Sequence, residues 1–430
     1  MKGWNKVPFG DLLIDSKDGE WGEGAPGVGL IAADMIRGTD FADLNSPSKS
    51  FPRRYVNERH AVRKRLQVGD IIFEMAGGTA KQSTGRSALI TQNFLNRRSE
   101  TFVLCASFCR HLRVDHSKYD PKFTYYLLQT LYGAGYMSVF NIQHTGVSRF
   151  QYTSFKKHTV LDIPGLATQR KIAAILSAYD DLIANNQRRI TLLERMAEDI
   201  YREWFVRLRF PGYKDKSNRI EKGVPHGWFL VPLERAFRFY GGATPSRDTP
   251  RYWNNGDVNW FTPTDITGAE GMFLSSSGER CTEEGVESCS SKMFPAYSVM
   301  MTSRATIGAI GINLTPACTN QGFITCIPNE AYPLGYLYHW LKLGKPYFES
   351  LSGGSTFAEL TKGTFKRMEI LTPPKPLVQQ FQKLVAPLFK AIETDLKVNE
   401  SLKATRDALL PRLISGKLAI DKLDIKTVPK

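Results

Sequence analysis

Two stretches decide the fold. Pro164–Phe205 reads PGLATQRKIAAILSAYDDLIANNQRRITLLERMAEDIYREWF, and Pro374–Leu418 reads PKPLVQQFQKLVAPLFKAIETDLKVNESLKATRDALLPRLISGKL. Apolar residues recur in both at heptad spacing, which predicts two long helices with coiled-coil seams. Each stretch closes a long segment of strand-like pattern, and the two starts lie 210 residues apart in a chain of 430. The chain therefore has a duplicated plan in which a globule is followed by a helix.

The predicted seams contain a polar residue at matching points. The first helix has seam lines Leu176, Ile183, Ile190, Ala197, Trp204 and Ile172, Tyr179, Asn186, Leu193, Ile200. The second has Val385, Ile392, Asn399, Leu413 and Phe381, Leu388, Asp395, Leu402, Leu409. Asn186 and Asn399 cost stability but fix register. Arg406 interrupts the second seam and Asp395 adds a charge to it, and we expect Pro387 to kink or start that helix because it removes a backbone hydrogen bond.

Each helix alone would expose an apolar stripe. The economical solution is that the two helices pack on each other antiparallel, within one chain, and join two globules. The alternative is that each helix covers its own globule.

The globules repeat each other faintly. Trp4, Val7 and Pro8 match Trp228, Val231 and Pro232, and residues 143–156 align with residues 353–366. Short strands are predicted at GDIIFEM, SALIT and TFVLCASF in the first globule and at SVMMTS, IGAIGI and GFITCIP in the second. A short helix is expected near TYYLLQTLYG and near GYLYHWLKLG. These patterns predict α+β globules with small, mostly antiparallel sheets.

The predicted order is globule, helix, linker, globule, helix and tail. The expected boundaries are 1–163 for the first recognition globule, 164–207 for its helix, 208–226 for the linker, 227–372 for the second globule, 373–416 for its helix and 417–430 for the tail.

Charge points to a polyanionic partner. The net charge is +15 and the pI is about 9.4, which favours double-stranded DNA or RNA over a generic surface. The surplus is uneven: residues 1–160 carry 22 Lys and Arg against 14 Asp and Glu, whereas residues 222–372 carry 13 of each. Any phosphate contacts of the second globule must therefore come from a local patch.

The compartment is predicted to be the cytoplasm. The N-terminus lacks an apolar signal core, and no apolar run approaches the length of a membrane span. The six cysteines are scattered through strand-like surroundings, and the spacing of Cys105, Cys109 and His111 does not fit a zinc site. They are best interpreted as buried free thiols in a reducing cytoplasm.

Motifs for catalysis are missing from the sequence. It has no Asn/Asp-Pro-Pro-aromatic loop to receive a flipped base, no HExxH and no G-x-S-x-G. Gly22–Gly27 (GEGAPG) fits a dinucleotide fingerprint by letter, but no helical run follows it, so a turn is favoured. Together these absences disfavour an enzyme and predict that the chain binds no metal or cofactor of its own.

Several loops concentrate side chains suited to DNA. Arg can recognise guanine and Gln or Asn adenine in the major groove, while Lys, Ser and Thr hold phosphates. For any one of these residues a solvated loop is an equally good interpretation. The candidates in the first globule are Lys81, Gln82, Ser83, Thr84, Arg86, Arg97, Arg98, Gln143, His144 and Arg149. Those in the second are Thr244, Ser246, Arg247, Arg304, Thr306, Ser355, Thr356 and Lys362.

The chain resembles the specificity subunits of type I restriction–modification systems. The resemblance rests on residues 167–206, on NESLKATRDALLPRLISGKL (residues 399–418) and on GGATPSRDTPRYWNNGDVNWFTPTDI (residues 241–266), which is similar to how recognition domains of this family begin. It covers essentially the whole chain, although the recognition loops match in kind rather than residue by residue.

The resemblance implies a non-catalytic subunit that reads a split DNA target, one half per recognition domain. It implies two modification (methyltransferase) subunits, which carry the S-adenosylmethionine site, and restriction subunits, which carry the ATP- and Mg-dependent motor and nuclease. Three alternatives remain at this point: a subunit of a related type II-like methyltransferase/nuclease complex, a coiled-coil scaffold without a DNA role, and an enzyme with a cryptic nuclease site.

Overall fold

The computed structural model describes residues 3–42, 44, 49–78, 82–144, 147–221, 223–353, 358–418 and 420. The chain divides into two compact units. Unit 1 comprises Met1–Ala184 and Ser401–Lys430, and unit 2 comprises Asn185–Glu400. Both long helices run from one unit into the other, so each unit contains a part of each helix.

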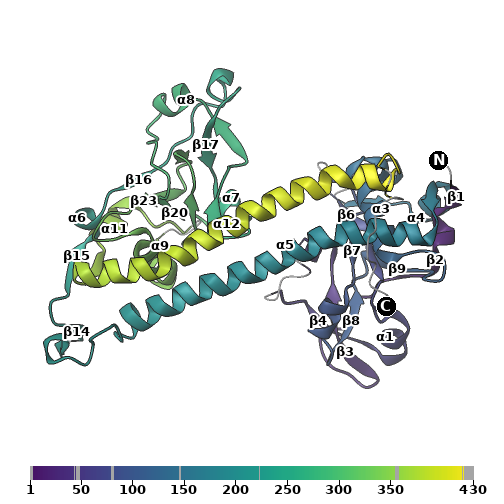
Figure 1. The fold of residues 1–430 in the computed structure, drawn as a ribbon, viewed down its shortest axis with the longest axis horizontal. Coiled ribbons are helices and arrows are strands. Elements are labelled where there is room, and N and C mark those ends of the chain that lie inside the picture. Colours follow the sequence, from purple (N-terminus) through teal and green to yellow (C-terminus); the bar gives the residue numbers. More distant parts are fainter. Residues whose placement is uncertain are drawn as a thin grey trace. The chain divides into compact units, whose positions relative to one another are not determined.

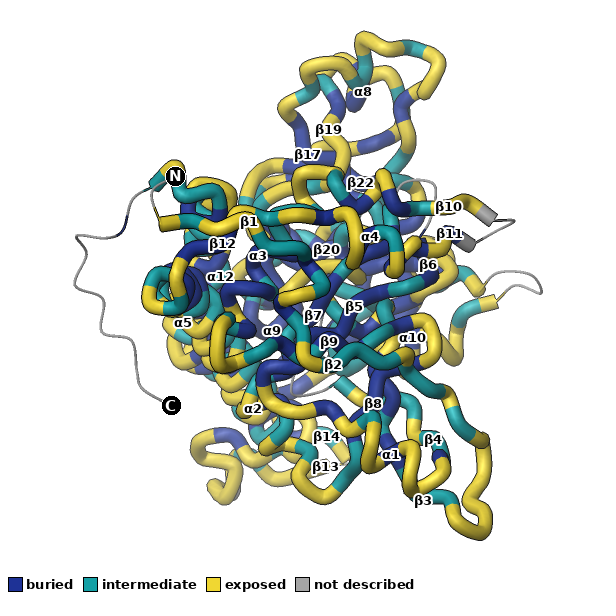
Figure 2. Tube along the Cα trace, turned by 90° about the vertical axis from the view of Figure 1, so that its right-hand side faces the viewer, coloured by how far each residue is buried: buried dark blue, intermediate teal, exposed yellow. Residues whose placement is uncertain are grey.

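Unit 1 is built on a four-stranded antiparallel sheet in the order β2-β9-β5-β7. Its central strand β5 (Ile71–Glu74, IIFE) is buried at every position, as expected for a short apolar run between two neighbours. Strands β5 and β9 are largely dark blue in Figure 2. The other strands of this sheet are β2 (Leu13–Asp18), β9 (Cys109–Val114) and β7 (Ser87–Leu89).

The remaining strands of unit 1 form three smaller sheets, ordered β4-β3-β8, β10-β11-β6 and β1-β12. These strands are β1 (Trp4–Pro8), β3 (Leu30–Ile36), β4 (Arg53–Asn57), β6 (Ala76–Gly78), β8 (Phe102–Cys105), β10 (Asn141–His144), β11 (Val147–Phe150) and β12 (Val160–Pro164). The short helices are α1 (Glu58–Lys64), α2 (Gln92–Asn96), α3 (Pro121–Gly133) and α4 (Tyr152–His158).

Unit 2 has a five-stranded sheet, ordered β16-β23-β20-β21-β18, and smaller sheets ordered β19-β17-β22, β15-β24 and β13-β14. Its strands are β13 (Ile220–Glu221), β14 (Val224–Pro225), β15 (Phe229–Pro232), β16 (Phe239–Gly241), β17 (Val258–Phe261), β18 (Phe273–Leu274), β19 (Glu279–Cys281), β20 (Val299–Thr302), β21 (Ile310–Asn313), β22 (Ala317–Thr319), β23 (Phe323–Cys326) and β24 (Glu369–Thr372). Its short helices are α6 (Leu233–Ala236), α7 (Pro263–Thr267), α8 (Glu283–Glu287), α9 (Leu334–Leu343), α10 (Lys345–Ser350) and α11 (Lys362–Arg367).

The two units repeat one architecture. The order β2-β9-β5-β7 corresponds to β16-β23-β20-β21, and all of these pairs are antiparallel. Each unit also has a three-stranded sheet whose middle strand pairs antiparallel on one side and parallel on the other. In unit 1 the middle strand β3 is antiparallel to β4 and parallel to β8. In unit 2 the middle strand β17 is antiparallel to β19 and parallel to β22. The α+β class and the strands and helices predicted from the six apolar runs and two helical patterns are confirmed.

A two-stranded ladder ties the start of each globule to its end. Strand β1 pairs with β12, so that Pro8 lies opposite Val160, and β15 pairs with β24, so that Pro232 lies opposite Glu369. The faint sequence match around Trp4 and Trp228 thus marks the same structural position in both units. A long helix begins just after each ladder.

The long helices are α5 (Leu166–Tyr201), which continues as a π-helical turn over Arg202–Val206, and α12 (Lys375–Ile414) (Figure 1). The expectation that Pro387 starts the second helix is wrong, because α12 begins at Lys375 and runs through it. Proline has no N–H to donate to the carbonyl of Lys383, four residues earlier. Both Pro387 and Lys383 are exposed, so water can solvate that carbonyl.

Within each unit the two helices pack together. In unit 1, Leu176 of α5 shares a core with Leu409 and Leu413 of α12. In unit 2, α9 and the first part of α12 cover the five-stranded sheet, and Ile190 joins the same core as Val385. The buried seam positions are Ile172, Leu176, Ile190, Ala197, Trp204, Phe381, Val385, Ile392, Asp395, Asn399 and Leu413, and the half-buried ones are Tyr179, Ile183, Asn186, Leu193, Ile200, Leu388, Leu402 and Leu409.

Polar pairs set the register of the seam. In unit 2, the Asn186 Nδ2 donates to Asn399 Oδ1 at 2.9 Å, and Arg189 pairs with Asp395 at 3.3 Å. From the first pair to the second, the residue number increases on α5 and decreases on α12, so the two helices are antiparallel. In unit 1, Arg406 pairs with Asp180 at 2.5 Å. The polar residues that interrupt the second seam therefore each find a partner on α5.

Candidate nucleic-acid interface

Four segments of unit 2 meet where β16, β20 and β23 end or begin: residues 241–247, 303–306, 319–322 and 358–362. We term them the unit 2 loop cluster. Backbone hydrogen bonds join them: Ala243 N donates to Thr319 O at 3.0 Å, Ser303 N to Gly322 O at 2.7 Å, and Leu360 N to Ser303 O at 2.9 Å. Segments far apart in sequence are thus fixed at one edge of the sheet, and most of the second globule's DNA candidates lie on them.

Glycine is needed where these segments touch. A Cβ at Gly242 would come under 3.0 Å from the carbonyl oxygens of Thr319 and Asn320. A Cβ at Gly241 would collide with the end of the Lys362 side chain, which lies across it. The Gly-Gly step therefore allows the first segment to pass close to the third and leaves room for an exposed lysine.

The segment from Thr244 to Arg247 is held by two tryptophans. The indole N–H of Trp260 donates to Ala243 O and that of Trp253 to Ser246 O, both at 3.0 Å. The Arg247 guanidinium lies 3.8 Å from the centre of the Trp253 ring and also pairs with Glu279. These rings thus act as anchors of the loop.

The other unit 2 candidates differ in how far they are engaged. The hydroxyl of Thr244 donates to Gln321 Oε1 at 2.8 Å, and Arg304 donates through Nε to Glu359 at 2.8 Å. Ser246, Thr306 and Lys362 are exposed. Ser355 and Thr356 lie outside the described residues.

Unit 1 has the equivalent loop cluster, made of residues 18–22, 75–78, 82–86, 105–108, 141–144 and 147–149. Glu20 N donates to Cys105 O at 2.9 Å, and Met75 N to Phe108 O at 2.8 Å, as Ala243 and Ser303 do in unit 2. Gly19 repeats the close approach of Gly242, because a Cβ there would come under 3.0 Å from Ala106 O. The same edge of the same sheet therefore presents polar loops in both units.

The structure places five of the unit 1 candidates at or near exposed loop surfaces. Gln82, Gln143 and Arg149 are exposed in the unit 1 cluster, and Arg97 is exposed at the end of α2. Ser83 is half-buried, and its carbonyl accepts a bond from the Tyr132 hydroxyl. Lys81 lies outside the described residues. His144 ends β10, and its side chain also lies outside the described part.

Three unit 1 candidates have partners that leave them little freedom to read a base. Arg86 donates to both oxygens of the buried Glu74 carboxylate, at 2.8 and 2.5 Å, and the ion pair raises the pKa of Arg86. Thr84 is fully buried and donates to Asn141. In this structure both residues support the loop cluster through these bonds, and their contact with DNA stays a prediction.

Arg98 is the third candidate with intramolecular partners, and its contact with DNA also stays a prediction. Its guanidinium lies 4.5 Å from the centre of the Phe51 ring and 4.7 Å from that of Phe94, and it donates to Lys49 O at 2.9 Å. Burial lowers the pKa of Arg98. The Arg98 side chain therefore covers the edge of an apolar core with both its methylene groups and its guanidinium.

Phe108 is a candidate that sequence reasoning missed. Its side chain is 62% exposed at the turn between β8 and β9, and its carbonyl accepts bonds from Met75 N and Ala76 N. An apolar ring held rigidly outside the core suits contact with a ligand surface. The signal in the sequence was a large apolar residue within a turn, CASFC (residues 105–109). Gly322 occupies the corresponding place in unit 2.

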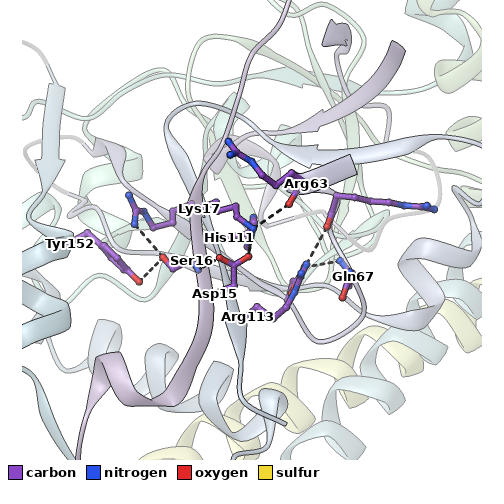
Figure 3. A network of polar contacts seen from close by, with 11 residues as sticks. Asp15, Ser16, Lys17, Arg63, Gln67, His111, Arg113 and Tyr152 are labelled. Atoms are coloured by element: carbon purple, nitrogen blue, oxygen red, sulfur yellow. Dashed lines mark hydrogen bonds and ion pairs between the residues drawn. The ribbon is translucent and has the colours of Figure 1, made fainter. Parts of the chain in front are cut away.

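A polar network on strands β2 and β9 of the unit 1 sheet resembles a catalytic constellation, but its histidine is fully buried (Figure 3). Asp15 accepts from Lys17 at 2.5 Å and faces His111 Nε2 at 3.4 Å. Burial raises the pKa of Asp15, but the bonds from Lys17 and His111 outweigh it and the net shift is downward. His111 is fully buried, and burial lowers its pKa. His111 has no exposed surface and cannot reach a substrate, whereas Asp15 and Lys17 are partly exposed. The contact between Asp15 and His111 joins β2 to β9.

Metal and membrane features were also sought. Across the described ranges, no group of three or more His, Cys, Asp or Glu side chains could hold a metal ion. The helices in those ranges include none long and apolar enough to span a bilayer. The six cysteines are free thiols, five of them buried.

Comparison with known proteins was made at the level of sequence and of fold. A family model described as the type I restriction modification DNA specificity domain matches residues 58–195 and 225–404, one segment for each globule. The type I restriction enzyme MjaIX specificity subunit of Methanocaldococcus jannaschii is 35% identical over 182 residues, which is 42% of either chain. The EcoR124I/EcoR124II specificity subunit of Escherichia coli is 24% identical over 419 residues, 93% of both chains.

Among solved structures, the S subunit of a type I restriction-modification system from M. genitalium aligns over 95% of this chain and 96% of its own. The TM-score is 0.55 and the sequence identity is 17%, so the likeness is one of fold.

Proposed function

The chain belongs to the family of type I restriction modification DNA specificity domains, and on that premise we propose that it is the DNA-reading subunit of a type I restriction–modification complex. One observation carries the proposal beyond the family: the same edge of the same antiparallel sheet bears a cluster of polar loops in both units. Glycine allows the close approach within each cluster, at Gly19 and at Gly242. Each cluster would read one half of a bipartite target in double-stranded DNA.

The loop clusters divide the work of recognition. Exposed Gln82, Gln143 and Arg149 in unit 1, and Arg247 and Arg304 in unit 2, have the donors and acceptors that base edges require. The exposed hydroxyl of Ser246 and the ammonium of Lys362 suit phosphates, which position a protein on the duplex without specifying sequence. Phe108 would contact a thymine methyl group. Together these contacts supply both orientation and sequence preference.

The chain would act without chemistry of its own. His111 is fully buried, and the sequence carries no base-flipping loop. Methyl transfer, DNA cleavage and translocation would belong to two modification subunits and to restriction subunits, which would carry S-adenosylmethionine, ATP and Mg. Exposed apolar side chains on the long helices, such as Leu192 and Met196, offer surface for such partners.

The experiment is selection from a pool of randomised duplex DNA by the full-length chain, followed by sequencing. We expect the enriched duplexes to share two short motifs separated by an unspecified gap of constant length. Binding should weaken steeply as salt rises, since phosphate contacts release counterions. One contiguous motif would contradict the two-reader model, and absence of salt-dependent binding would favour the scaffold without a DNA role.

A further inference from the structure

The tip of the unit 2 hairpin between β20 and β21 contains a strained backbone conformation. Arg304, Ala305 and Thr306 are the exposed residues of this tip. Ala305 has a φ of 57°, a left-handed conformation that costs free energy in a residue other than glycine. Ala305 N donates to Ala358 O at 3.1 Å, so the segment 358–362 holds the tip in place. The strained conformation of Ala305 at an exposed position indicates that the orientation of the side chains at this tip is functionally important.

The direction of Arg304 is set by a carboxylate. Its Nε donates to Glu359 Oε1 at 2.8 Å, across the isolated bridge that joins the two segments. Both side chains remain partly open, with 48% of Arg304 and 38% of Glu359 exposed. The bond uses one side of the guanidinium, and within the described part of the chain no acceptor is bonded to the terminal Nη atoms. The outer edge of the arginine is therefore presented to solvent in a fixed orientation.

A guanidinium held in this way matches one base. Its two terminal N–H groups can donate in parallel to O6 and N7 of guanine in the major groove, a pairing that no other base offers. An exposed ion pair contributes little to stability, about 0–1 kcal/mol, because water screens it. Its effect on recognition is larger, since a pre-oriented side chain loses less conformational freedom on binding.

The arrangement is confined to unit 2. In unit 1 the equivalent bridge joins Ala76 to Arg149, so a small apolar residue replaces Arg304 and an arginine replaces Glu359. Arg149 is exposed. The two units thus carry different charges at one structural position, which is what different half-sites require.

Resting on the proposed function, we propose that Arg304 reads a single guanine in the half-site of unit 2 and that Glu359 is its positioning residue. Arg304 is then a specificity-determining residue, and Glu359 acts only through it.

The test repeats the selection from randomised duplexes with full-length variants. Arg304→Ala should lower the preference for one guanine by about tenfold to a hundredfold, the range of one bidentate contact. Glu359→Ala should lower the preference for the same guanine by a smaller factor, about threefold to tenfold on the same scale, while affinity for non-specific duplex rises because a negative charge is lost. Arg219→Ala is the matched control, since Arg219 is also exposed and paired with a glutamate, Glu221, outside the cluster.

The outcomes separate this proposal from the proposed function. If the unchanged chain enriches no sequence, the function fails. If the unchanged chain enriches a bipartite sequence and Arg304→Ala retains every preference, the function stands and the inference is overturned. Equal loss across both half-sites, or a Glu359→Ala effect at a different base from that of Arg304→Ala, would also overturn it. Retention of the other preferences in the unit 2 half-site reports that unit 2 of each variant is folded.

Discussion

Phe108 shows what a single exposed residue can decide. Its ring is 62% exposed, so removing it costs the folded protein little. We expect Phe108→Ala to weaken selection of a thymine in the unit 1 half-site by about fivefold to tenfold, roughly 1 kcal/mol of lost apolar contact. The melting temperature should stay close to that of the unchanged chain. An unchanged unit 1 half-site would show that the ring has another purpose.

His339 makes the stability of unit 2 depend on pH. The residue is fully buried, stacks on Tyr201 at 5.4 Å and donates through Nδ1 to Gly335 O at 2.7 Å. Burial lowers the pKa of His339 to about 4, below the value of about 6.5 in an unfolded chain. The unfolded state therefore binds the proton first, and the stability contributed by the neutral ring is lost as pH falls from about 6.5 to 4.

The prediction compares the unchanged chain with His339→Phe, which retains a ring but cannot titrate. Between pH 7.5 and pH 5 the unchanged chain should lose about 2 kcal/mol more unfolding free energy than the variant. Urea titration followed by tryptophan fluorescence suits this test, because five of the seven tryptophans lie in unit 2. Parallel pH profiles for the two proteins would rule out His339 as the cause.

At the residue scale, sequence reasoning identified side-chain types but not their partners. Arg86 and Arg304 lie on similar polar hairpin loops, yet one is bound to Glu74 inside the unit and the other is presented outward by Glu359. Those partners lie 12 and 55 positions away in the chain. Whether an arginine recognises DNA or holds a loop depends on such pairings, which a local pattern does not encode.

At the scale of elements, the heptad seam was predictable because its signal is local and repeated. Pro387 was expected to kink or start the second helix because it lacks an N–H, but α12 begins at Lys375 and continues through it. A proline on the solvent side of a long helix leaves one carbonyl to water, and packing of the rest of the helix outweighs that loss. The parallel neighbours β3–β8 and β17–β22 were not predicted, because they join segments separated by other strands.

The Asn186–Asn399 bond should contribute more to register than to stability. Asn186→Ala should lower the unfolding free energy by about 1 kcal/mol, the usual worth of one hydrogen bond. Replacing both residues by Leu should recover that loss or exceed it, since apolar side chains suit a seam. A double-mutant cycle measures the difference. Additive effects of the two single substitutions would show that the bond contributes nothing.

The two helices should also set the gap between half-sites. Insertion of seven residues after Asn186 and seven before Asn399 keeps the heptad phase and lengthens both helices by about 10 Å. The gap should then grow by roughly three base pairs, at about 3.4 Å per base pair along one strand. Lengthening α5 alone should give a smaller change or weaken assembly. The selected duplexes report the gap directly, and an unchanged gap or altered half-sites would exclude the helices as the spacer.

At the scale of the whole molecule, the duplication was visible in sequence through two helical stretches 210 residues apart. The correspondence of the globules was faint, because surface loops differ while the ladder residues at Pro8 and Pro232 recur. The structure adds that both globules present equivalent loop edges, which patterns of apolar residues do not specify. One chain can therefore contain two DNA-reading units that share an architecture but prefer different half-site sequences.

The measurement that tests this account most directly is a map of methylated bases in the genome of cells with and without this chain. If one chain supplies both readers, methylated sites in cells that contain it should share a bipartite motif with a gap of constant length. All of these sites should lose methylation together when the chain is absent. A methylation pattern that persists without the chain, or a motif that is contiguous, would contradict the account.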